Sequence, residues 1–167
     1  RIPIDIQYTD PKLCTDNGAM IATLGCFKAM NNQETAEPYT LSILLHEYFG
    51  PRYVLWDGGI LATDVAESAL DIARQGIYAP DRLAFLPTHL RDTYFQSRPD
   101  GSWQPTDQIR RDVLFRRLNL MADSFPFRGQ FQLIFCRNVM IYFDLPTRQR
   151  LVRKLQAVLE SGGYLVV

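Results

Sequence analysis

Cysteine and histidine are scarce in this 167-residue sequence. Cys14, Cys26 and Cys136 form no C-x-x-C pair, and one cysteine is left over if two are joined, so we expect reduced thiols rather than a disulfide framework. The two histidines, His46 and His89, have no neighbour at zinc-ligand spacing, and the helical pattern around His46 favours a surface or partly packed position. The sequence therefore predicts no metal site.

Long hydrophobic runs are also missing. No stretch approaches the roughly 18 apolar residues that a membrane span requires, and the start, RIPIDIQYTD, lacks the basic segment and apolar run of a secretory signal. The composition, 47% hydrophobic and 22% charged, is that of a globular chain rather than a disordered one. We expect one cytoplasmic, monomeric unit of about domain size.

Lysine is rare, since 15 of the 18 basic residues are arginine, and the formal net charge is zero. A neutral chain argues against a protein built around nucleic acid. Residues 1–84 carry 6 basic and 11 acidic side chains, whereas residues 85–167 carry 12 and 7. The basic second half is compatible with an acidic partner, and equally with an arginine-rich solvated surface.

Hydrophobic periodicity predicts alternating helices and strands. A helix is expected from Cys14 to about Met30, and a second from Thr35 to Gly50-Pro51 with Leu41, Leu44, Leu45 and Tyr48 on one face. GILAT (59–63) has the pattern of a buried strand, followed by a helix with Ala66, Ala69, Leu70 and Ala73 on one face.

The second half of the chain continues this pattern. Residues 86–117 are polar and contain Pro87, Pro99, Gly101 and Pro105, which indicates an excursion from the sheet with a small helix and a hairpin. A strand is predicted at 131–136, a helix at about 146–160, a Gly162-Gly163 turn and a last strand at 164–167. The alternation predicts parallel strands in a doubly wound α/β sheet.

Motifs for hydrolysis and phosphate binding are absent. The sequence shows no Ser/His/Asp, Cys/His or paired-carboxylate pattern, and neither G-x-G-x-x-G nor G-x-x-x-x-G-K. Polar residues do follow the predicted strands, where open α/β sheets bind ligands. Asp64 there suits the two hydroxyls of a ribose, or it begins a capping box with Glu67. Asn138 and Asn119, with Leu120, suit an adenine edge or an amino-acid group, or the asparagines form turns with their own backbone.

Residues from about 34 to 167 resemble the catalytic domain of CheR, the chemotaxis receptor methyltransferase. The matching segments, in the family's order and spacing, are AEPYTLSILL (36–45), ILATDVAESALDIARQGIY (60–78), LRDTYF (90–95), VLFRRLNL (113–120) and FQLIFCRNVMIYFD (131–144). The CRNVMIYFD block is the most specific of them.

This resemblance implies an α/β, Rossmann-like, S-adenosylmethionine-dependent methyltransferase sheet with a small β-subdomain inserted at about 85–115. It implies methylation of glutamate side chains on the cytoplasmic helices of chemoreceptors, or a non-catalytic receptor-binding module derived from the same domain. Carried over by position, the cofactor residues are Glu37, Asp64, Asn119 with Leu120, and Asn138 with Val139. No catalytic side chain is assigned.

The segment before Glu37 departs from the family. It reads LGCFKAMNNQETA where the family has a strand and a glycine-containing loop, so the resemblance implies a sheet without its first strand, and without its last strands at the other end. CTDNGAMIA (14–22) resembles the glycoprotease-like family that makes threonylcarbamoyl-adenosine on tRNA, in which the counterpart of Asp16 binds metal. We therefore expect residues 1–33 to be of other origin than residues 34–167.

Overall fold

The computed structural model describes residues 20–24, 37–55, 58–84, 86–136 and 139–167. Seven strands and five α-helices follow one another in this part of the chain. In order they are β1 Met20–Leu24, α1 Glu37–Phe49, β2 Gly59–Asp64, α2 Glu67–Gln75, α3 Thr88–Tyr94, β3 Phe95–Ser97, β4 Trp103–Pro105, α4 Asp107–Arg111, β5 Val113–Arg117, β6 Phe131–Phe135, α5 Leu145–Ala157 and β7 Leu159–Val166. Short 3-10 helices span Gly50–Leu55, Pro80–Leu83 and Met140–Tyr142.

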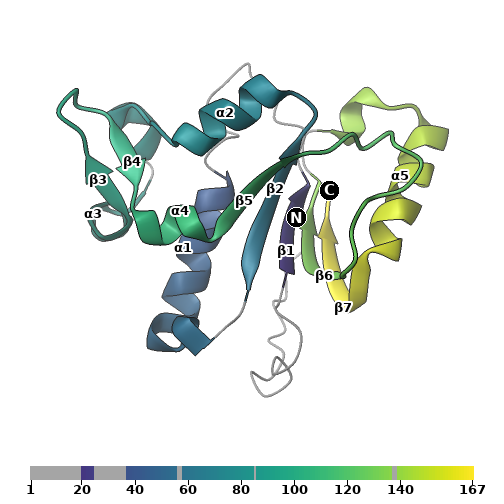
Figure 1. Cartoon of the computed structure of the whole chain (residues 1–167), viewed down its shortest axis with the longest axis horizontal. Coiled ribbons are helices and arrows are strands. Elements are labelled where there is room, and N and C mark those ends of the chain that lie inside the picture. Colours follow the sequence, from purple (N-terminus) through teal and green to yellow (C-terminus); the bar gives the residue numbers. More distant parts are fainter. Residues whose placement is uncertain (1–19, 25–36, 56–57, 85, 137–138) are drawn as a thin grey trace.

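Five of the strands form one sheet in the order β5-β2-β1-β6-β7, and all neighbours in it are parallel. The chain builds outward from β1 through β2 to β5, then crosses to the other side of β1 to add β6 and β7 (Figure 1). The order of the strands therefore reverses between β1 and β6. The doubly wound α/β prediction is confirmed.

The strand β1 corrects two predictions. Residues 20–24 are a strand and not part of a helix, and the sheet does not lack a strand at its centre, because β1 pairs with β2 on one side and β6 on the other. Met20 and Leu24 have helical spacing, but a run of five residues of which four are apolar is equally compatible with a central strand that pairs on both sides. The sheet thus includes residues that precede position 34; the separate origin of residues 1–33 stays a prediction.

Helices cover both faces of the sheet. Alternate residues of β2 point to opposite sides, as the two-residue period of a strand requires. Ile60 and Ala62 belong to a core with α1 and α2, whereas Leu61 belongs to a second core with α5. Leu151 and Leu155 of α5 are fully buried in that second core.

Helix α1 is correctly predicted, but its buried face is not. Tyr39, Ile43 and His46 are buried, whereas Leu44 and Tyr48, expected on the inner face, are exposed. The pattern of leucines is misleading because the helix packs one side on β2 and another on α4, so polar residues also lie inside.

The predicted excursion from the sheet is present. It contains α3, the antiparallel hairpin β3–β4 and α4, and it returns to the sheet at β5 (Figure 1). A β-bridge between Tyr78 and Trp103 ties the hairpin to the segment after α2, and the guanidinium of Arg91 lies 4.9 Å from the centre of the Trp103 ring. The hairpin is thus fastened to the main domain.

The last strand begins earlier than predicted. Gly162 and Gly163 lie inside β7, where the pairing with β6 shifts from Phe131↔Leu159 to Leu133↔Tyr164. The backbone of Gly162 has φ +83°, a conformation that glycine adopts without strain. The Gly-Gly pair forms an irregularity within the strand rather than the turn before it.

No helix in the described ranges is both long and apolar enough to cross a membrane.

Candidate functional site

The carboxyl ends of three central strands meet at one edge of the sheet. In the register of the ladder, Leu24 of β1 pairs with Thr63 of β2, and Asp64 pairs with Arg117 of β5. On the other side of β1, Thr23 pairs with Phe135 at the end of β6. Ligands of open α/β sheets bind beyond this edge, where the strand order reverses.

Asp64 lies at this edge as the last residue of β2, and it is only 1% exposed. Its Oδ1 accepts a hydrogen bond from the backbone N–H of Ala66, at 2.7 Å. The capping box with Glu67 is not formed, because α2 begins after Ala66 and the Glu67 carboxylate pairs with Arg74 instead. Asp64 thus closes a turn just before α2 through one carboxylate oxygen, instead of forming the capping box.

Asn119 and Leu120 follow β5 at the same edge. The backbone N–H of Leu118 donates to the carbonyl of Asp64, at 2.9 Å, which places the start of this loop beside the end of β2. Asn119 Oδ1 accepts from the N–H of Met121 at 2.9 Å, so the turn-forming interpretation of this side chain is confirmed. Its NH2 group donates to no residue of the described chain, and it is solvent-exposed.

Of the other predicted cofactor residues, the structure describes three and leaves out one. Leu120 and Val139 are buried within the α5-side core. Glu37 is the first residue of α1. Asn138 lies outside the described residues, between the buried Cys136 and Val139.

A serine, a histidine and an aspartate that are far apart in the sequence also meet in the structure. Asp112 Oδ2 accepts from Ser42 Oγ at 2.6 Å and lies 2.8 Å from His46 Nε2. The other ring nitrogen of His46 is 3.1 Å from Gln108 Nε2. A nucleophilic triad needs the histidine between serine and carboxylate, whereas here the carboxylate lies in the middle. This cluster connects α1 to α4 and does not activate the serine.

Tyr53 packs against this cluster, with its ring centre 3.6 Å from that of His46. Burial, and then the hydrogen bond and charge of Asp112, raise the pKa of the Tyr53 phenol well above its usual range. The phenol therefore stays neutral, which suits a structural role.

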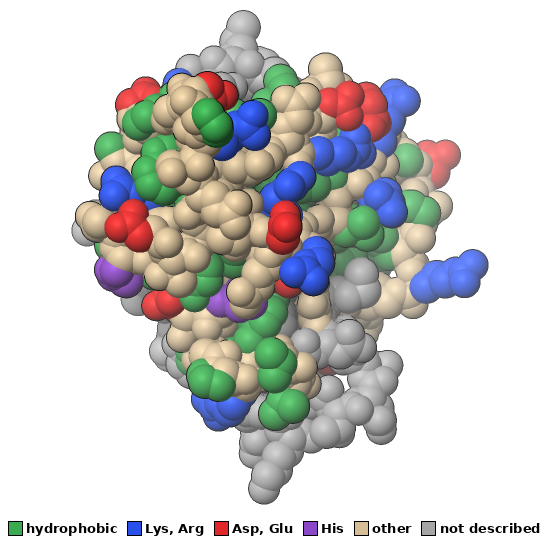
Figure 2. All heavy atoms as spheres, turned by 60° about the vertical axis from the view of Figure 1, so that its left-hand side comes forward, with side chains coloured by type: hydrophobic (Ala, Val, Ile, Leu, Met, Phe, Trp, Pro, Cys, Tyr) green, Lys and Arg blue, Asp and Glu red, His purple; other side chains and the backbone are tan. Residues whose placement is uncertain are grey.

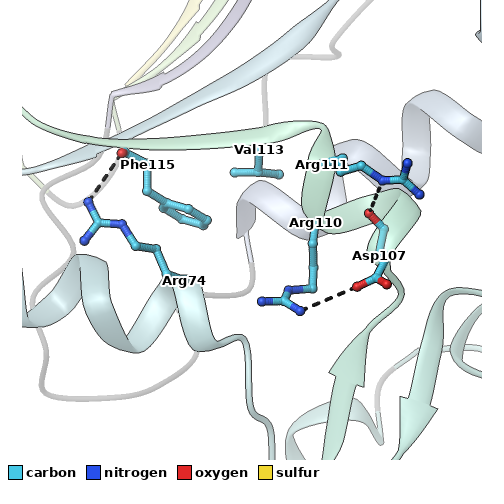
Figure 3. A pocket seen from close by; sticks show the side chains of 6 residues that line it. All are labelled: Arg74, Asp107, Arg110, Arg111, Val113 and Phe115. Carbon is cyan, nitrogen blue, oxygen red and sulfur yellow. Dashed lines mark hydrogen bonds and ion pairs between the residues drawn. The ribbon is translucent and has the colours of Figure 1, made fainter.

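A separate pocket of about 650 Å³ opens between α2, α4 and β5 (Figure 3). Val113 and Phe115 form its apolar part, and Arg74 and Arg110 extend into it from two helices. Arg74 is already engaged by Glu67 and Asp71, each at 2.7 Å, and Arg110 lies 3.6 Å from Asp107. No predicted site residue lines this pocket.

The same pairing of charges extends over the surrounding surface. Figure 2 shows acidic side chains interspersed with the basic ones on the face turned forward. Several arginines of the basic second half have an aspartate close by, among them Arg91 with Asp92 at 3.0 Å and Arg98 with Asp100 at 3.7 Å. The excess of arginine thus does not form a uniformly basic patch there.

Lys154 is a residue of the site region that the sequence reasoning missed. From α5 its ammonium donates to the carbonyl oxygens of Leu120 and Ala122, both at 2.6 Å. Helical spacing could have indicated Lys154, because it comes three residues after the buried Leu151 and so lies on the same side of α5.

The sheet is parallel and doubly wound, and it carries a buried carboxylate at the carboxyl ends of its strands, near the point where the strand order reverses. This combination defines an α/β domain of the nucleotide-binding class. Residues 32–167 match the family model described as "CheR methyltransferase, SAM binding domain". The chain therefore belongs to the CheR methyltransferase family, as its resemblance implied.

Known relatives agree with this assignment. The chemotaxis protein methyltransferase of Borreliella burgdorferi is 44% identical over 131 residues, which cover 78% of this chain and 46% of that protein. Chemotaxis protein methyltransferase 1 of Pseudomonas aeruginosa is 34% identical over 164 residues, or 95% of this chain and 58% of that protein. The chain thus spans about half the length of these curated relatives.

Among solved structures, a TehB-like SAM-dependent methyltransferase from Corynebacterium glutamicum superposes with a TM-score of 0.48 at 15% identity, over 92% of this chain and 56% of that chain. The family match and the two relatives do not support the resemblance of residues 14–24 to the glycoprotease-like tRNA family.

The described residues fit the cofactor of the family, S-adenosylmethionine. A carboxylate is the acceptor that a ribose diol needs, and Asp64 supplies one at the carboxyl edge. Leu120 and Val139 are apolar and buried, and Asn119 keeps an amide NH2 group as a donor.

Proposed function

We propose that this chain binds S-adenosylmethionine at the carboxyl edge of its sheet and forms the cofactor domain of a protein-glutamate O-methyltransferase. The observation that carries the proposal is Asp64, a carboxylate 1% exposed at the end of β2, next to the reversal of strand order. The family match over residues 32–167 supports the same conclusion.

Each site residue has a role in this proposal. Asp64 accepts hydrogen bonds from the ribose hydroxyls, and Asn119 with Leu120 borders the adenosine. Asn138 and Val139 border the methionine part, and Glu37 lies near the cofactor at the start of α1. The cofactor, when bound, supplies a methyl group that a sulfonium has activated toward displacement.

The reaction requires little acid–base assistance from the chain. A glutamate side chain has a pKa of about 4.3 in model peptides, so it is ionised at neutral pH. The chain's task is then to hold two reactants in line and exclude water, and such alignment contributes roughly 7–11 kcal/mol in favourable cases. The absence of an activated nucleophile in the Ser42, His46 and Asp112 cluster agrees with this mechanism.

We propose that the partners are the cytoplasmic helices of methyl-accepting chemoreceptors, and that the chain acts in the cytoplasm as a monomer. The two relatives are chemotaxis protein methyltransferases, which supports a substrate that belongs to chemotaxis. In this proposal the segment at about 85–115 is an inserted subdomain, whose hairpin β3–β4 is available for such a contact.

Calorimetric titration with S-adenosylhomocysteine tests cofactor binding. We expect a micromolar Kd for the parent chain and at least a tenfold weaker Kd for Asp64→Ala, because a hydrogen bond to a charged group contributes about 1.5–3 kcal/mol. Asp71→Ala is the matched control, since it removes a carboxylate from the exposed side of α2. Equal binding by the parent and Asp64→Ala would refute the assigned role of Asp64.

The transfer reaction is tested with radioactive cofactor and receptor cytoplasmic fragments. Glutamate methyl esters release labelled methanol in base, whereas N-methyl groups do not, so base-released label identifies the product. A folded chain that binds receptor fragments but not S-adenosylhomocysteine would favour the receptor-binding module over the enzyme.

A further inference from the structure

Lys154 of α5 clamps the loop that follows β5. Its Nζ donates to the carbonyl oxygens of Leu120 and Ala122, both at 2.6 Å, and lies 4.9 Å from the centre of the Phe125 ring. Two charge-assisted hydrogen bonds and a cation–π contact thus converge on one ammonium group. All three partners belong to the connection between β5 and β6.

The ammonium has given up part of its hydration for these contacts. Burial lowers the pKa of Lys154, and the charge of Arg150 lowers it further, while Asp123 acts in the opposite direction. None of the ion pairs within the described ranges includes Lys154. Backbone carbonyls, rather than a carboxylate, therefore stabilise the charge of Lys154. The strength of these hydrogen bonds depends on the position of the loop that carries the carbonyls.

The clamped loop carries two of the proposed cofactor residues. Its first turn is closed by Asn119, whose Oδ1 accepts from Met121 N–H and whose carbonyl accepts from Ala122 N–H at 3.1 Å. The segment between β5 and β6 contains no helix or strand, so its backbone has few partners of its own.

The other end of the clamp is rigid. Leu151 and Leu155, on either side of Lys154 in α5, are fully buried in the core. The lysine therefore connects an irregular loop to a helix that packs against the sheet.

We propose that Lys154 is a positioning residue for the cofactor, which holds Asn119 and Leu120 in place through the carbonyls of their loop without touching the ligand. This role rests on the proposed function, because it assigns the Asn119–Leu120 loop to the cofactor site.

Three variants of the full chain test the role. Lys154→Met keeps the length of the side chain and removes the donors, and Lys154→Arg keeps donors and charge. Arg153→Met removes a charge from the neighbouring exposed position of α5 and serves as the control. We expect the Kd for S-adenosylhomocysteine at 10 °C to rise about tenfold in Lys154→Met, to recover within about threefold in Lys154→Arg and to stay unchanged in Arg153→Met.

Hydrogen exchange supplies a readout at the loop itself. The amides of Met121 and Ala122 should exchange at least tenfold faster in Lys154→Met than in the parent, while the amides of β6 stay protected. A purely structural role predicts a different result for Lys154→Met. Its Tm would be lower than that of the parent, but its Kd at 10 °C would be unchanged. If Lys154→Met does not fold, Lys154→Gln takes its place with the same expectations.

The outcomes separate the two proposals. A parent chain that binds S-adenosylhomocysteine, with an unchanged Kd in Lys154→Met, overturns the positioning role alone. A folded parent chain that does not bind overturns the proposed function, and the positioning of a cofactor with it. Weaker binding that Lys154→Arg restores, with faster exchange at Met121 and Ala122, supports the role.

Discussion

Tyr39 illustrates what one buried hydroxyl does in this protein. Its Oη donates to the carbonyl of Ala73 at 2.8 Å, which joins the first turn of α1 to the end of α2. The ring is 1% exposed and packs edge-on against Tyr78 and Phe115. Burial raises the pKa of Tyr39 to about 12, although nearby Arg110 acts in the opposite direction.

We predict that Tyr39→Phe lowers the free energy of unfolding by about 1–2 kcal/mol at pH 8, because the Ala73 carbonyl loses its partner. The raised pKa means that the folded state favours the neutral phenol. The contribution of the Tyr39 hydroxyl to the free energy of unfolding is therefore complete below about pH 10, and it is lost as the pH rises from about 10 toward 12. Urea unfolding at pH 8 and pH 11 should show a smaller alkaline loss in the variant than in the parent.

The pKa of Tyr94 is also raised to about 12, by burial first and then by its hydrogen bond to Glu47, so part of the alkaline loss should persist in Tyr39→Phe. An identical loss of stability between the two pH values in parent and variant would contradict the assignment to Tyr39.

At the scale of the element, β7 depends on glycine at a close approach rather than at a turn. A Cβ atom at Gly163 would lie 3.0 Å from the carbonyl oxygens of Gln132 and Glu160 and from Leu159 Cδ1. Two of these three atoms are backbone, so β6 or β7 itself would have to move. The irregular pairing of β7 with β6 thus requires a residue without a side chain at this position.

We predict that Gly163→Ala destabilises the chain by about 1–3 kcal/mol, the usual range for overpacking. Ser161→Ala, at an exposed position of the same strand, is the control and should change stability by less than about 0.5 kcal/mol. Urea unfolding of both variants measures the difference. Equal stability of the two would mean that β7 accommodates a methyl group without moving.

At the scale of the whole molecule, β1 unites the two halves of the sheet. Ala22 pairs with Leu61 of β2 on one side and with Ile134 of β6 on the other. The core with α1 and α2 and the core with α5 lie on opposite faces of the sheet that β1 completes. Without this strand, β2 and β6 would expose unpaired edges, which favour aggregation.

We predict that Ala22→Pro removes most of the free energy of unfolding and promotes aggregation, since proline lacks the N–H that a central strand must donate. Ala22→Gly keeps that N–H and should cost only about 0.5–1 kcal/mol. Circular dichroism and sedimentation velocity measure both effects. A proline variant that unfolds cooperatively, as a monomer, near the parent's midpoint would show that β1 is dispensable.

Local patterns in the sequence were sufficient for much of the fold and for the position of Asp64 at the end of β2. The apolar run of β2 and the small-residue face of α2 predicted both elements, and Asp64 followed from its place after the strand. These features are readable because strand and helix periods depend only on near neighbours along the chain. The CRNVMIYFD block and its companion segments were sufficient for the family.

Tertiary structure decided the rest. Met20–Leu24 became a strand because two neighbours pair with it, and a five-residue run does not contain that information. His46 is buried because Asp112, 66 positions later, lies beside it, and Lys154 holds the carbonyl of Leu120, 34 positions earlier. Such partners are chosen only when folding brings distant segments together. Sequence alone therefore determined most of the elements and the family, whereas the packed sheet decided which polar groups from distant segments lie together.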